Sequence, residues 1–160
     1  MKLYSQYQAI LEKVKRNHAD RLLHAFQLHC EAGNWLNSAV LKLQKSNWSD
    51  HGMSQGIFFS VWVGNSDIET NRFNYNIHAL KLGLQKRCGV KPVAFARAFR
   101  SKFPFTGWPN VSTDYGPLTL MQGWLPLHLR TFEQDTLDLI ERFASKHHII
   151  DELLNQRNAA

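Results

Sequence analysis

The spacing of apolar residues predicts a sheet of short strands in the middle of the chain. Residues 38–44 alternate apolar with more polar side chains, and residues 72–79 do so without interruption, which is the two-residue period of a half-buried strand. Residues 57–63 are β-branched or aromatic almost throughout. They are expected to form a central strand with a helix over each face, or with a ligand pocket on one face. A later strand is expected at 118–125, before Pro126.

The 72–79 segment has two interpretations. As a strand, its polar face carries four hydrogen-bonding side chains, Arg72, Asn74, Asn76 and His78. A rival interpretation starts a helix at Ile77, because Leu80 and Leu84 follow it at intervals of three and four. We prefer the strand through His78 and leave residues 79–87 open between strand and helix.

Helical spacing predicts three helices. Residues 4–31 carry apolar side chains at helical intervals that lapse at 17–20, so either one helix passes through or Asp20 caps a second one, and Gly33 is the expected stop. Residues 93–103 follow a proline suited to a first helical turn and place their phenylalanines on one face. The last helix is expected to open at Thr131, whose spacing to Gln134 is that of a capping box, and to continue through Leu153 and Leu154.

The predicted order is helix, strand, strand, strand, helix, strand, helix. Short connections among the first three strands favour an antiparallel meander, to which the 118–125 strand is added later. The amphipathic helices at the two ends are expected to pack on this small sheet. We therefore predict one α+β domain over residues 1–160, which is long enough to bury a core.

Composition and charge indicate a basic globular protein. The chain is 44% hydrophobic and 20% charged, with a formal net charge of +6, a balance typical of folded rather than disordered chains. Residues 70–113 contain no Asp or Glu but carry Arg72, Lys81, Lys86, Arg87, Lys91, Arg97, Arg100 and Lys102. Such a basic block attracts phosphates or another anionic surface, unless the acidic first half of the last helix offsets it within the fold.

The sequence contains no metal, cofactor or catalytic motif. Its eight histidines form no HxxxH, HxH or HExxH pattern, and GxxxxGK[ST], GxGxxG and GxSxG are missing. We expect no cofactor and no metal, and whether the chain is an enzyme stays open. Cys30 and Cys88 lie too far apart for a CxxC motif and are expected to be reduced thiols. Because no signal-peptide or membrane-span pattern is found, we expect a soluble cytoplasmic protein without a membrane partner.

These patterns favour a non-catalytic binding protein for an anionic ligand or nucleic acid. In this hypothesis the basic block contacts phosphates, while the polar strand face and exposed aromatic side chains contact bases. No RNP1, KH or zinc-finger motif accompanies them. The candidate ligand-binding residues are Arg72, Asn74, Asn76, His78, Arg97, Arg100, Lys102, Trp108 and Asp114, with Lys86, Arg87 and Lys91 as further phosphate contacts.

Two alternatives stay open. Residues 104–117 are rich in Pro and Gly and long for a connector, which predicts a stiff loop whose aromatic side chains either pin it to the fold or meet a ligand. A small-molecule-binding protein or enzyme would place its pocket between the sheet and this loop. Its polar anchors would be His78, Asn76, Arg97 and Asp114, among Trp62, Trp108 and Tyr115. A protein-interaction domain would form a homodimer through its aromatic surface.

Overall fold

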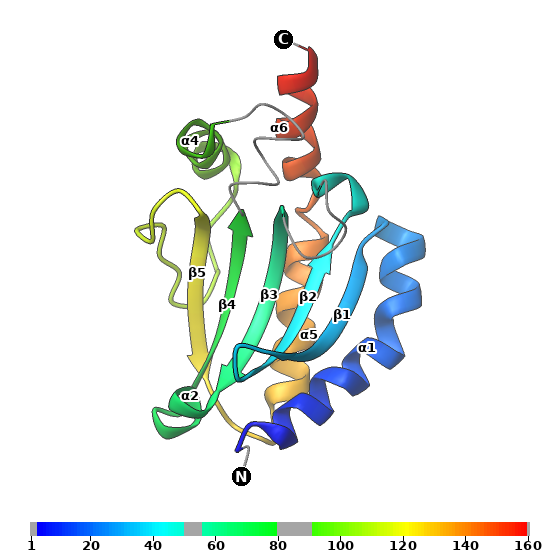
Figure 1. Ribbon diagram of the computed structural model, residues 1–160, viewed down its shortest axis with the longest axis vertical. Coiled ribbons are helices and arrows are strands. Elements are labelled where there is room, and N and C mark those ends of the chain that lie inside the picture. Colours follow the sequence, from blue (N-terminus) through cyan, green and yellow to red (C-terminus); the bar gives the residue numbers. More distant parts are fainter. Residues whose placement is uncertain (1–2, 50–55, 80–90, 160) are drawn as a thin grey trace.

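A five-stranded antiparallel sheet is the centre of the computed structural model, which describes residues 3–49, 56–79 and 91–159 (Figure 1). Each strand pairs with the one before it, so the sheet is a meander. The strands are β1 (His29–Trp35), β2 (Ser38–Gln44), β3 (Ile57–Gly64), β4 (Arg72–Ala79) and β5 (Thr119–Pro126). The predicted α+β class is confirmed, and the 57–63 segment lies at the centre of the sheet as expected.

The long helices lie on one face of this sheet. α1 (Ser5–Phe26) packs against β1, β2 and α5 (Phe132–Ala144), and α5 runs behind the sheet in Figure 1. α4 (Pro92–Lys102) and α6 (His148–Ala159) contact each other beyond the end of β4, while the short α2 (Asn65–Glu69) and the single-turn η1 (Ser46–Trp48) are connections. Within the described ranges, no helix has the length and apolar character needed to cross a membrane.

The hydrophobic core fills the space between the sheet and these helices. Alternate strand residues point into it with no exposed area, among them Leu41, Phe59, Val61, Tyr75 and Ile77. The ring of Phe59 stacks on that of Phe143 from α5 at a centroid distance of 4.7 Å. Since successive strand residues point to opposite faces, the side chains between these positions must lie on the other side of the sheet.

The first helix is shorter than predicted, and β1 takes its last residues. α1 passes through 17–20 without a break, which supports the single-helix alternative, but it ends at Phe26. Gln27 is in the left-handed conformation, with φ of 60°, and its backbone N–H closes the helix. Gly33 therefore lies inside a strand and is not the stop. The expectation of helix at 28–31 was wrong because the helical spacing of apolar residues continued beyond a cap that glutamine rarely supplies.

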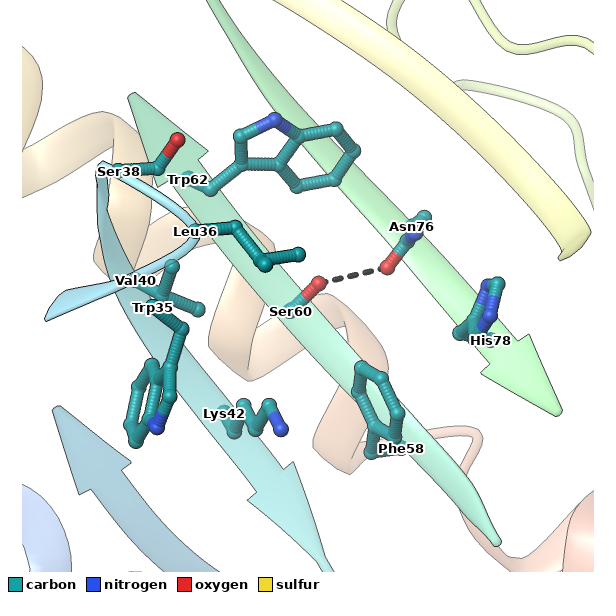
Figure 2. A pocket seen from close by; sticks show the side chains of 10 residues that line it. All are labelled: Trp35, Leu36, Ser38, Val40, Lys42, Phe58, Ser60, Trp62, Asn76 and His78. Atoms are coloured by element: carbon teal, nitrogen blue, oxygen red, sulfur yellow. Dashed lines mark hydrogen bonds between the residues drawn. The ribbon is translucent and has the colours of Figure 1, made fainter. Parts of the chain in front are cut away.

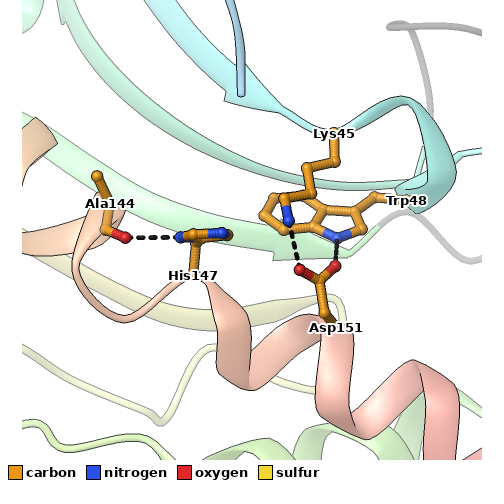
Figure 3. Close-up of polar contacts among 5 residues, drawn as sticks. All are labelled: Lys45, Trp48, Ala144, His147 and Asp151. Carbon is orange, nitrogen blue, oxygen red and sulfur yellow. Dashed lines mark hydrogen bonds and ion pairs between the residues drawn. The ribbon is translucent and has the colours of Figure 1, made fainter. Parts of the chain in front are cut away.

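The last helix is divided in two. α5 ends at Ala144 and α6 begins at His148, so the predicted continuous helix is corrected to a bent pair. Figure 3 shows how the second half is held: Asp151 accepts hydrogen bonds from Lys45 Nζ at 2.5 Å and Trp48 Nε1 at 2.8 Å. At the bend, Nδ1 of His147 lies 2.6 Å from the carbonyl oxygen of Ala144. Polar contacts with the β2 end thus fix where α6 lies.

Candidate functional site

One face of the sheet has no helix over it in the described part of the chain, and we call it the uncovered face (Figure 1). The side chains there alternate with the core residues of each strand. The uncovered face carries Glu31, Trp35, Ser38, Val40, Lys42, Phe58, Ser60, Trp62, Arg72, Asn74, Asn76, His78, Gln122 and Trp124. This set is unusual for a water-facing surface, because several aromatic rings lie among hydrogen-bonding groups.

Strand pairing arranges the uncovered face in rows. One row is polar: Lys42 pairs with Ser60, Ser60 with Asn76, and Asn76 with Gln122. Within it, Ser60 Oγ donates a hydrogen bond to Asn76 Oδ1 at 2.6 Å. The adjacent row holds Trp62, Asn74 and Trp124, each paired with the next. A ligand on this face would therefore meet aromatic rings beside a line of hydrogen-bonding groups.

A hollow of about 490 Å³ opens on the uncovered face (Figure 2). Its volume lies within the range of roughly 300–1,000 Å³ that small-molecule sites occupy. The lining combines apolar rings with a few polar groups, again as in such sites. The lining residues are Trp35, Leu36, Ser38, Val40, Lys42, Phe58, Ser60, Trp62, Asn76 and His78.

Lys42 is the only lysine or arginine among these lining residues, and none of them is an Asp or Glu. Its Nζ lies 4.4 Å from the ring centroid of Phe58 and 5.1 Å from that of Trp35. Burial lowers the pKa of Lys42, and the nearby carboxylate of Glu31 partly opposes this shift. No ion pair joins Lys42 to a described carboxylate. Among its described lining residues, the hollow thus has one Lys or Arg side chain, which lies against two aromatic rings.

His78 supplies a different kind of group. Its Nδ1 lies 3.2 Å from Thr119 Oγ1, and its ring centroid is 5.5 Å from that of Phe58. Burial lowers the pKa of His78, and the positive charge of Lys42 lowers it further. The neutral imidazole is therefore favoured at neutral pH, where it serves as a hydrogen-bonding group rather than a second cation.

The rim of the hollow includes the strained tip of the β1–β2 hairpin. Leu36 and Asn37 have φ of 54° and 59°, the positive values that a tight two-residue hairpin turn requires. Asparagine tolerates this conformation but leucine rarely adopts it. Leu36 is also 97% exposed, and its neighbour Trp35 is exposed as well. Leu36 thus combines an unfavourable backbone conformation with an exposed apolar side chain beside the hollow.

The predicted residues of β4 come together on the uncovered face. Asn76 and His78 line the hollow, and Asn74 lies beside it in the next row. The guanidinium carbon of Arg72 lies 3.8 Å from the ring centroid of Trp124, so this side chain stacks on the indole. The alternation of 72–79 had predicted this shared face.

The other predicted cations lie elsewhere and have other contacts. Arg100 donates hydrogen bonds to the carbonyl oxygens of Gly116, Thr119 and Leu120, so it holds α4 against the start of β5. Lys102 Nζ lies 3.7 Å from a carboxylate oxygen of Glu152 in α6. Arg97 and Lys91 are exposed on α4 and at its N-cap. Lys81, Lys86 and Arg87 lie outside the described residues, as does most of the 79–87 segment.

The basic block of the sequence therefore does not form one surface in the described residues. Arg72 is at the start of β4, whereas α4 lies beyond its other end (Figure 1). Two acidic residues of α5 pair with α1 instead of this block: Glu133 with Lys13, and Glu141 with Arg21. The sequence left open that the acidic first half of the last helix offsets the basic block, but these ion pairs offset charges on the first helix.

Residues 104–117 close the outer edge of β5. Trp108 is buried, with its ring centroid 5.4 Å from that of Tyr75, whose hydroxyl donates to the carbonyl oxygen of Pro109 at 2.7 Å. Ser112 exchanges two backbone hydrogen bonds with Gln122 of β5. Asp114 is exposed on this segment. The predicted pocket beneath this loop is not where the hollow lies, since no residue of 104–117 lines it.

Several lining residues were not among the predicted ones. Lys42, Ser60, Phe58 and Trp35 reach the hollow from three strands. The alternation of 38–44 already placed Lys42 on a polar strand face, so that signal was present. What no local pattern supplies is the pairing of β2 with β3, which brings Lys42 beside Ser60.

Neither a metal centre nor a reactive thiol is found in the described residues. No cluster of three or more His, Cys, Asp or Glu side chains suited to a metal ion occurs within the described ranges. Cys30 is buried, and desolvation raises its pKa to about 12, which keeps the thiol protonated and unreactive.

The fold and the hollow together define an α+β protein with a ligand-sized site on an open antiparallel sheet. Compared with known proteins, the chain matches no family model, no curated protein and no solved structure. Its function is therefore argued from the chemistry of this site.

Proposed function

We propose that this chain is a binding protein whose ligand occupies the hollow on the uncovered face and carries a flat or apolar body with at least one anionic group. The observation that supports the proposal is the position of Lys42 against the rings of Phe58 and Trp35, since it is the one Lys or Arg among the described lining residues. Catalysis forms no part of the proposal.

The anionic group of the proposed ligand is inferred from the positive charge of Lys42. Lys42 is half-buried and has no ion-pair partner among the described residues, and a partly desolvated ammonium gains most from a carboxylate, phosphate or sulfonate. None of the described lining residues is an Asp or Glu, although Glu31 is the cross-strand partner of Lys42 on the same face. The pKa of Lys42, lowered by burial, would return toward its usual value once an anion lies beside it.

The flat or apolar body of the proposed ligand is inferred from the apolar side chains that line the hollow. Trp62 is half-buried, and Trp35 and Leu36 are exposed, and all three line the hollow (Figure 2). Burying these side chains against a ligand removes apolar surface from water, and rings stack favourably on rings. Ser60, Asn76 and His78 then supply the few polar contacts that orient a ligand.

A matched pair of fluorescent probes tests both parts. Anilinonaphthalene sulfonate has the anionic group and the aromatic body, and phenylnaphthylamine has the body alone. Lys42→Met keeps the apolar stem and removes the charge. We expect it to weaken sulfonate binding by about ten- to a hundredfold, the value of a hydrogen bond to a charged group, and to leave phenylnaphthylamine binding unchanged. Trp62→Leu should weaken both probes.

Lys146→Met is the matched control, because Lys146 is exposed at the α5–α6 bend on the helical side of the sheet. It should bind both probes like the unmodified chain. The proposal fails if Lys42→Met leaves sulfonate binding intact, or if it weakens both probes equally while circular dichroism shows an unchanged fold.

A further inference from the structure

We infer that the anionic ligand is a single strand of nucleic acid, which crosses the uncovered face from Lys42 to the Arg72–Trp124 stack. This inference rests on the proposed function, because the hollow is one end of the path. It adds a second contact point outside the hollow, since neither Arg72 nor Trp124 lines it.

The two cations lie too far apart for one phosphate. Lys42 pairs with Ser60 and Ser60 with Asn76, so two strand spacings separate Lys42 from β4, and Arg72 is four residues further along β4. Strand geometry makes that about 17 Å between their backbones. Nζ of Lys42 also lies against Phe58, which pairs with His78 at the end of β4 away from Arg72. A ligand that contacts both cations needs several anionic groups.

The two cations of this path differ from the cations on the helical side in their contacts with acids. Arg72 and Lys42 form no ion pair with the described carboxylates, unlike Lys13, Arg21 and Lys45 on the helical side. Within the described residues, the one carboxylate of the uncovered face is that of Glu31, which is the cross-strand partner of Lys42 and partly offsets its charge. With the chain's net charge of +6, the face is complementary to a polyanion.

The rings between the cations are placed to stack bases. Trp62 and Trp124 flank Asn74 in one row across three strands, and both indoles are partly exposed. The guanidinium carbon of Arg72 lies over the Trp124 ring, 3.8 Å from its centroid, and guanidinium groups are themselves stacking surfaces for bases. Single-stranded nucleic acid is bound by such alternation of aromatic platforms and cations.

Side-chain amides lie where base edges would be. Asn74, Asn76 and Gln122 have both donors and acceptors and are half-buried on β4 and β5. Bases reach these groups only when they are unpaired and turned toward the sheet, which a duplex does not allow. The face therefore suits a single strand better than a double helix.

Fluorescence anisotropy with a labelled oligothymidylate of about ten nucleotides, a length within the usual single-strand site sizes, tests the inference. Thymidine monophosphate, the same sequence as a duplex, and polyglutamate are the comparison ligands. We expect the oligonucleotide to bind more tightly than the monophosphate or the duplex. The slope of log affinity against log salt should become shallower by about 0.7 for each phosphate that a variant no longer neutralises.

Arg72→Gln should reduce both the affinity for the oligonucleotide and this slope. Trp124→Leu should reduce the affinity by roughly five- to a hundredfold, the effect of losing one stacked base, with little change in slope. Arg97→Gln is the matched control. It removes an arginine that the sequence also favoured, but from the exposed side of α4 and away from the sheet face. It should leave both quantities unchanged.

The outcomes separate this inference from the proposed function. If the oligonucleotide binds no more tightly than the monophosphate at low salt, the single-strand inference is wrong, although Lys42-dependent binding of the sulfonate probe still supports the hollow. If Arg97→Gln weakens binding as much as Arg72→Gln does, the face is not the path. If polyglutamate competes as well as the oligonucleotide at equal charge, the surface recognises acidic polypeptides and the inference is likewise overturned.

Discussion

The two faces of this sheet are built from the same five strands but from different side chains. On the helix-covered face, Phe59, Tyr75 and Ile77 have no exposed area, and their neighbours are other apolar groups. On the uncovered face, Ser60, Asn76 and Trp62 lie at the alternate positions of the same strands. A strand's two-residue period makes such a division possible. The first face supports the fold, and the second carries the hollow.

The cations show the same division. In the helical layer, Lys13, Arg21 and Lys45 pair with carboxylates of α5 and α6. On the uncovered face, Lys42 and Arg72 lie against aromatic rings instead. Contacts of this kind hold a cation in place without neutralising it. Its charge stays available to an incoming anion.

The largest expected effect comes from comparing two residues of β3 that point to opposite faces. Phe59→Ala removes a fully buried ring that stacks on Phe143, and should lower the free energy of unfolding by about 3–5 kcal/mol. Trp62→Ala removes a larger but half-buried ring and should cost only about 1 kcal/mol. Urea unfolding measures both. An equal decrease at Trp62 would show that the uncovered face supports the fold rather than a ligand.

Two glycines sharpen the comparison. A Cβ on Gly123 would lie 2.3 Å from the Tyr75 hydroxyl and 2.6 Å from the carbonyl oxygen of Pro109. Gly123→Ala should therefore displace the hydrogen bond between these groups and cost about 2–3 kcal/mol, the upper range for overpacking. At Gly33, on the uncovered face, the nearest atom would be the Trp35 ring at 3.5 Å. Gly33→Ala should be neutral or slightly stabilising, and a similar destabilisation at both sites in thermal unfolding would contradict this division.

Much of this division was predictable from alternation. The 72–79 pattern predicted the face shared by Arg72, Asn74, Asn76 and His78, and the apolar 57–63 run predicted the central strand with a ligand pocket as one option for its second face. In both segments the strand period alone sets which side chains lie together. The local pattern was sufficient there, because alternation within a single strand decides which of its own side chains share a face.

The failures have physical reasons as well. β1 was not predicted because its core positions hold the small residues Cys30 and Ala32, which give a weak alternation. In addition, the helix before it ends at Phe26 with Gln27 as its cap, a residue that does not signal a helix end. The hollow is lined by residues of four strands, so the set of lining residues depends on how the strands pair. No local sequence pattern specifies that pairing. The basic block is one stretch of the sequence. In the fold, however, Arg100 donates hydrogen bonds to backbone carbonyl oxygens and Lys102 forms an ion pair with Glu152. Charge along a sequence is therefore a poor guide to charge on a surface.

A smaller effect is expected in the helical layer. Asp151→Asn removes the negative charge beside Lys45, whose side chain is only 12% exposed, and leaves that ammonium without its ion pair. We expect a decrease of about 1–2 kcal/mol in the free energy of unfolding. Glu133→Gln is the control, since its ion pair with Lys13 is largely exposed and such pairs contribute little. Equal effects in urea unfolding would mean that the contacts in Figure 3 do not hold α6.

The smallest expected effect is a pH dependence at the uncovered face. Burial and Lys42 lower the pKa of His78 in the folded chain, so the unfolded chain takes up its proton at a higher pH. The stability that neutral His78 provides is present above its unfolded pKa of about 6.5 and is lost as the pH falls through the lowered folded value. As the pH falls from neutral to mildly acidic, the free energy of unfolding should therefore decrease less for His78→Asn than for the unmodified chain. Urea unfolding at several pH values measures this.

A bound anion should act on the two faces differently. His147 also has a lowered pKa, chiefly from burial, but it lies at the α5–α6 bend, on the helical side. A negative group in the hollow favours the protonated form of His78, so oligothymidylate should raise the pKa of His78 and leave that of His147 unchanged. Titration of the two imidazole rings by nuclear magnetic resonance, with and without the oligonucleotide, measures this. If both pKa values move together, the anion acts on the whole molecule, and the uncovered face is not its specific site.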